Sequence, residues 1–140
     1  MTARACGAPE YRGEGVKHRI LVVEDNPLNR ELLCDWLEVE GYEVRTTGDL
    51  DGAMRSMGHY RPDAVFWDVQ LGNQDKLALA AWMRKQPELC SIPVIAVTAH
   101  ALVTKQSSFL QAGCNACVSK PISFKVLREE LERWLQTART

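Results

Sequence analysis

The feature that most constrains the fold is the regular alternation of short apolar runs with helical patterns after residue 18. Most of these runs are rich in β-branched or aromatic residues, which is typical of strands covered on both faces. The predicted strands are residues 20–23, 42–46, 64–67, 93–97 and 116–119. Helical patterns cover residues 27–40, 50–59, 76–85, 102–112 and the segment from 124 onward. Right-handed crossovers then favour an α/β fold, a doubly wound parallel sheet with helices on both faces.

Two of the predicted helices carry clear apolar stripes. The first has Pro27 in its first turn and Gly41 after its end, which are start and stop signals. Its apolar residues at helical spacing are Leu28, Leu32, Leu33, Trp36 and Leu37. The last helix has a stripe that we expect to be buried, made of Phe124, Leu127, Leu131, Trp134 and Leu135.

Length and charge limit the function classes. A chain of 140 residues has room for one domain. Residues 1–17 have no apolar period and are expected to form a flexible N-terminal tail, with the domain at 18–140. The net charge of −1 gives no sign of a nucleic-acid surface. No apolar run approaches the ~20 residues of a membrane span, and we expect a cytoplasmic protein that binds neither nucleic acid nor membrane.

The five cysteines do not resemble a disulfide framework, because their number is odd and their spacing irregular. We therefore expect reduced thiols. Cys114 and Cys117 form a C-x-x-C pair, but no second pair stands at the spacing of a zinc site. The pair also follows a helix and leads into a strand, the reverse of a redox motif, and we interpret it as incidental.

Polar residues stand where four of the predicted strands end, and the carboxyl ends of parallel strands share one edge of a sheet. Three carboxylates at one edge would repel one another unless a cation neutralised them. Oxygen ligands without His or Cys favour Mg²⁺, and a lysine with a hydroxyl beside it suits a phosphoryl group. The alternative for the first two acids is that they cap the next helix. The residues concerned are Glu24, Asp25, Asp68, Thr98 and Lys120.

Four motifs resemble the signatures of response-regulator receiver domains, in order and at the right spacing. They are ILVVEDN (20–26), FWDVQL (66–71), PVIAVTA (93–99) and AGCNACVSKP (112–121), and the resemblance extends from about residue 19 to residue 135. It implies a flavodoxin-like five-stranded sheet of order 2-1-3-4-5 with five helices. It also implies phosphoryl transfer to an aspartate from a histidine kinase or a histidine phosphotransfer protein, and a downstream protein target.

The same resemblance assigns roles to individual residues. Asp68 would be the phosphoacceptor, and Lys120 would pair with phosphoryl oxygens, with a cis bond to Pro121. The Mg²⁺ ligands would be Asp25, Asp68 and the Gln70 backbone carbonyl, with Glu24 acting mostly through water. Thr98 would be the switch hydroxyl, and Ala99 would leave room for the phosphoryl group. Gln70 and His100 would flank the path of an attacking water.

Two departures from the family pattern bear on signalling. The loop at residues 71–76 lacks the usual proline and glycine landmarks, and Cys117 stands where an aromatic residue is usual. A thiol cannot swing as a ring does, so we expect that Thr98 acts chiefly through the segment near His100.

Three functions remain open on the sequence. The first is a phosphorylation-controlled interaction module without an output domain of its own, and residues 25–30 favour a phosphorelay version of it. The second is a degenerate receiver that works without phosphorylation. The third is a Mg²⁺-dependent aspartyl phosphatase, which is disfavoured because Gln70 replaces the second acid that such chemistry needs.

Overall fold

The computed structural model describes residues 18–68, 78–98, 113–119 and 123–139. Its sheet has five parallel strands in the order β2-β1-β3-β4-β5, which confirms the expected topology. The strands are β1 (Arg19–Val23), β2 (Glu43–Thr47), β3 (Ala64–Asp68), β4 (Val94–Thr98) and β5 (Ala116–Ser119). The helices are α1 (Pro27–Val39), α2 (Leu50–Met57), α3 (Ala78–Arg84) and α5 (Phe124–Arg139). The tail at 1–17 and the helix expected at 102–112 lie outside the described residues.

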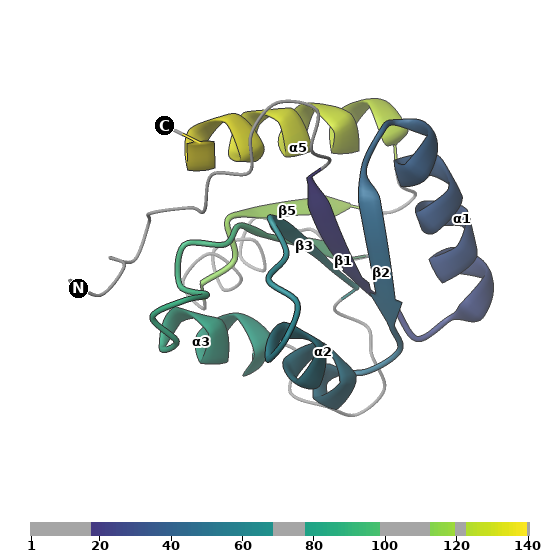
Figure 1. Cartoon of the computed structure of the whole chain (residues 1–140). Helices are drawn as coiled ribbons and strands as arrows, with labels where there is room; N and C mark the ends of the chain where they lie inside the picture. Colours follow the sequence, from purple (N-terminus) through teal and green to yellow (C-terminus); the bar gives the residue numbers. More distant parts are fainter. Residues whose placement is uncertain (1–17, 69–77, 99–112, 120–122, 140) are drawn as a thin grey trace.

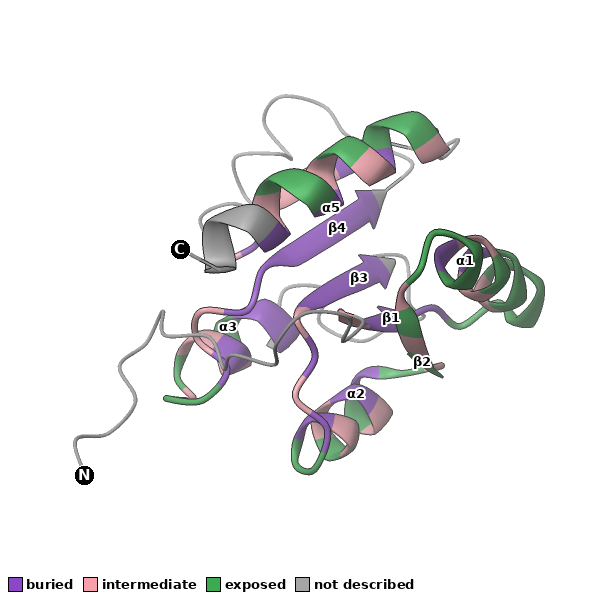
Figure 2. Cartoon of the chain, turned by 45° about the horizontal axis from the view of Figure 1, so that its top comes forward, coloured by how far each residue is buried: buried purple, intermediate pink, exposed green. Residues whose placement is uncertain are grey.

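Two hydrophobic layers sandwich the sheet, with α1 and α5 on one face and α2 and α3 on the other (Figure 1). Strands β1, β3 and β4 are buried on both faces, which explains their nearly continuous apolar sequences (Figure 2). The layer under α2 and α3 includes Leu21, Val23, Val65, Trp67, Val94 and Ala96. The layer under α1 and α5 includes Ile20, Val22, Phe66, Ile95, Leu33, Leu37, Leu127, Leu131 and Leu135.

Helix α1 begins and ends with the expected signals, but its apolar residues divide between two faces. Asn26 is its N-cap, with a side-chain oxygen that accepts from the N–H groups of Leu28 and Asn29. Gly41 follows the helix with φ of +99°, a conformation that favours glycine. Leu33 and Leu37 are buried, whereas Leu28 and Leu32 are 76% and 57% exposed. Helical spacing alone does not separate a core stripe from an apolar surface.

The C-terminal half of α1 is held against α5. The rings of Trp36 and Phe124 stack with centroids 4.7 Å apart. Arg128 donates to both carboxylate oxygens of Glu40, at 2.9 Å from Nε and 3.0 Å from Nη2. These contacts hold α1 and α5 together on one face of the sheet.

The cysteines only partly follow the expectation. Cys34, Cys114 and Cys117 are free thiols. Cys90, after α3, is in a disulfide bond, so the expectation of reduced thiols is wrong there. No helix in the described part of the chain is long and apolar enough to cross a membrane.

Candidate functional site

The register of the sheet brings the predicted strand-end residues to one edge. Val23 pairs with Trp67, Asp68 with Val97, and Thr98 with Ser119. Glu24 directly follows Val23, so it neighbours the end of β3 where Asp68 stands. Adjacent strands lie ~4.8 Å apart, which places the backbones of these residues within reach of one small ligand. The side chains of Asp68 and Thr98 are not described, and Gln70, Ala99, His100, Lys120 and Pro121 lie outside the described residues.

Glu24 is 2% exposed and is the one charged residue that is buried in the described part of the chain. Its N–H donates to the Thr47 carbonyl at 3.0 Å, and its carboxylate accepts from the Asn26 N–H at 3.1 Å. Its carbonyl accepts from Arg30 Nη1 at 2.9 Å. A buried carboxylate is costly unless its charge is compensated.

The capping interpretation of the acidic pair is not what the structure shows. Asn26, the next residue, caps α1 with its own side chain. Asp25 is exposed on the turn between β1 and α1, beside the buried Glu24. The turn therefore presents two carboxylates that the helix does not need for its N-terminus.

The described side chains include part of the expected metal site. Among them, no three His, Cys, Asp or Glu residues gather as a metal site. Of the four ligands expected for Mg²⁺, the described side chains include only Glu24 and Asp25. Glu24 and Asp25 fit Mg²⁺ in their chemistry, because both supply the hard oxygen ligands that this ion prefers.

Cys117 lies in a row of residues that crosses the sheet. Trp67 pairs with Ala96, and Ala96 pairs with Cys117, so the three share the face covered by α2 and α3. Trp67 is fully buried, and half-buried Cys117 packs against the same cluster. The large indole thus stands two strands away from the small thiol, with only a methyl group between them. The expectation that Thr98 acts chiefly through the segment near His100 remains a prediction.

The sequence reasoning included Arg30 in residues 25–30 but missed its contact with the backbone of the acidic turn. An arginine in the first turn of a helix has no distinctive pattern, because such residues are usually solvated. Its contact with Glu24 depends on how α1 packs beside β1 and β2.

Comparisons with known proteins agree on one family. Residues 20–132 match the family model of the response regulator receiver domain. The polar-differentiation response regulator DivK of Brucella anthropi is 39% identical over 120 residues, which cover 85% of this chain and 97% of that protein.

Solved structures give the same answer. A response regulator from Chloroflexus aurantiacus superposes with a TM-score of 0.81 at 27% identity, over 86% of this chain and 99% of that one. The receiver domain of a sensor histidine kinase from Pseudomonas aeruginosa has a TM-score of 0.78 at 35% identity, over 86% and 99% of the two chains. That protein was crystallised with a magnesium ion coordinated in its active site cleft. The present chain belongs to the response regulator receiver domain family, and it is a signalling domain of two-component systems rather than a classical enzyme.

Proposed function

We propose that this receiver domain accepts a phosphoryl group on Asp68 from a phosphohistidine, with Mg²⁺ at the carboxyl edge of the sheet. The observation that carries the proposal is the buried carboxylate of Glu24 beside the end of the strand that bears Asp68. The magnesium ion in the related Pseudomonas aeruginosa receiver domain supports it.

The chemistry divides among the residues at this edge. An oxygen of Asp68 attacks the phosphorus while the bond from phosphorus to the donor nitrogen breaks, and the imidazole leaves. Glu24, Asp25, Asp68 and the Gln70 carbonyl would hold Mg²⁺, which neutralises charge on the phosphoryl oxygens when bound. Lys120 would supply a further positive charge, and the Thr98 hydroxyl would donate to a phosphoryl oxygen of the product. Gln70 and His100 would control the access of water, and with it the lifetime of the acyl phosphate.

Phosphorylation at Asp68 is tested by intact-mass analysis after incubation with acetyl phosphate and Mg²⁺. We expect one added phosphoryl group on the wild type and none on Asp68→Asn, because we propose that only Asp68 combines a strand-end carboxylate with both the ion and Lys120 nearby. Asp51→Asn, which alters an exposed carboxylate on α2, should behave as the wild type. A phosphoryl group on Asp68→Asn would contradict the assignment. None on either protein would favour a module that works without phosphorylation.

The protein partner is proposed to dock on α1. Leu28 and Leu32 are one turn apart at the end of the helix nearest the acidic turn, and both are exposed. Exposed leucines beside a reaction site are typical of a surface that a protein partner covers. A histidine kinase or a phosphotransfer protein bound there would bring its phosphohistidine to the carboxyl edge of the sheet.

Replacing both leucines should slow phosphotransfer from a protein donor only. In the double variant Leu28→Glu, Leu32→Glu we expect at least about a tenfold lower rate, ~1.4 kcal/mol, from a purified phosphotransfer protein that phosphorylates the wild type. The rate with acetyl phosphate should not change, because this small donor needs no docking. Val39→Glu is the matched control, since Val39 is 83% exposed at the other end of α1. Equal slowing with both donors would show that the leucines act on the site itself.

A further inference from the structure

We infer that Arg30 and Gly48 form a positioning unit for the acidic pair, and that this unit sets the affinity of the site for Mg²⁺. The inference rests on the proposed function, because it concerns the same ion. It assigns no ligand role to either residue. Both would act through the backbone of the turn that carries Glu24 and Asp25.

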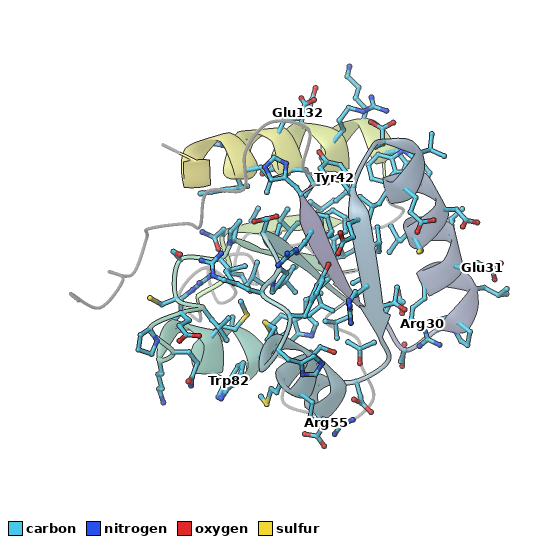
Figure 3. All side chains as sticks on the ribbon, viewed as in Figure 1. Arg30, Glu31, Tyr42, Arg55, Trp82 and Glu132 are labelled. Atoms are coloured by element: carbon cyan, nitrogen blue, oxygen red, sulfur yellow. The ribbon has the colours of Figure 1, made fainter. Side chains whose placement is uncertain are left out.

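The first observation is that three hydrogen bonds hold Glu24. Its backbone N–H is tied to Thr47 on β2, and its carboxylate is tied to the N–H of Asn26. Its carbonyl has Arg30 Nη1 as a donor at 2.9 Å. The last bond connects the first turn of α1 to the end of β1, and Figure 3 shows Arg30 on that end of α1.

The second observation is the close approach of the same guanidinium to Gly48, the residue after β2. A Cβ at Gly48 would lie 2.8 Å from Arg30 Nη1 and 4.0 Å from the Glu24 carbonyl oxygen. Gly48 is not in the left-handed region, so its backbone does not require glycine. The missing side chain instead makes room for the hydrogen bond between Arg30 and Glu24.

Charge and positioning predict opposite effects on the metal. A positive group beside the acidic pair weakens cation binding by repulsion. A hydrogen bond that holds the turn strengthens binding, because residues that orient metal ligands typically contribute ~10–100-fold to affinity. Gly48→Ala separates the two effects, since it changes no charge and moves the guanidinium away from the carbonyl. If charge dominated, this substitution would strengthen Mg²⁺ binding.

The experiment is a Mg²⁺ titration followed by ¹⁵N NMR chemical shifts. We expect Gly48→Ala to raise the Kd for Mg²⁺ by about tenfold. In an Arg30→Met background, the same substitution should change the Kd by less than about twofold, because the displaced group is gone. Arg55→Met, which removes an exposed arginine on α2, measures the effect of one lost charge without the contact.

Amide exchange without Mg²⁺ gives a second readout. Exchange at residues 24–26 should be faster in Gly48→Ala and in Arg30→Met, and unchanged in Arg55→Met. A Kd for Gly48→Ala within twofold of the wild type, or a tighter one, would overturn the inference, as would an equal loss in both backgrounds. Absence of Mg²⁺ binding by the wild type would instead overturn the proposed function, and the inference with it.

Discussion

Arg84→Met is expected to lower the free energy of unfolding by about 3 kcal/mol. Arg84, the last residue of α3, is half-buried and donates five hydrogen bonds at 2.8–2.9 Å. Two go to the Gly113 carbonyl, one each to the carbonyls of Cys90 and Ile92, and one to Asn115 Oδ1. Each buried acceptor left without a donor costs ~1–3 kcal/mol, and partial exposure lowers the sum.

The position admits no simple replacement. An ammonium group lacks the planar fork that reaches several acceptors at once, so Arg84→Lys should recover less than half of the loss. Gly113 has φ of +115°, and a Cβ there would lie only 2.9 Å from Arg84 Cγ, which is too close. The loop before β5 is thus packed tightly against this side chain. Burial lowers the pKa of the guanidinium, but an arginine stays charged because its ordinary value is so high.

Urea unfolding measures the effect as a shift of the midpoint at an unchanged slope. Arg55→Met is the control, because an exposed arginine should contribute within about 0.5 kcal/mol. A loss below about 1 kcal/mol for Arg84→Met would mean that water replaces the guanidinium at little cost.

The sheet could be predicted from the sequence because its order follows from local patterns and chain connectivity. Runs such as residues 20–23 and 64–67 are apolar throughout, and strands covered on both faces require this. Once the strands are parallel, their carboxyl ends share an edge. It can then be predicted, without knowledge of side-chain packing, that Glu24, Asp68 and Thr98 lie next to one another.

What the sequence did not reveal depends on contacts between distant segments. Arg30 meets Gly48 across 18 positions, and Arg84 meets Asn115 across 31 positions. Neither arginine differs in local context from a solvated one such as Arg55. The exposure of Leu28 and Leu32 was not predictable for a related reason, since periodicity reports that a face is apolar but not what covers it.

Alkaline pH should destabilise the protein through Cys114, which is 4% exposed in the core under α3. Burial raises the pKa of this thiol from 9.0 to about 12, although the nearby Arg84 guanidinium acts in the opposite direction. Folding therefore favours the protonated thiol. Its contribution to stability is complete below the unfolded pKa near 9 and is lost as the pH rises toward 12.

At about pH 10.5 the thiol is ionised in the unfolded chain and still protonated in the folded chain. This pH lies roughly 1.5 units above the unfolded pKa, which corresponds to a loss of about 2 kcal/mol in the free energy of unfolding. We expect urea unfolding to show that the wild type loses about 2 kcal/mol more than Cys114→Ala between about pH 7.5 and 10.5, under the same reducing conditions. Cys34→Ala is the control, because Cys34 is a more exposed thiol on α1. This variant should lose as much stability as the wild type over the same pH range. Burial also raises the pKa of Tyr60 to about 12, so Cys114→Ala should retain a smaller decline above pH 10. Equal losses in the wild type and Cys114→Ala would show that water or a local opening solvates the buried thiolate. The loop before β5 would then open more easily than its hydrogen bonds to Arg84 imply.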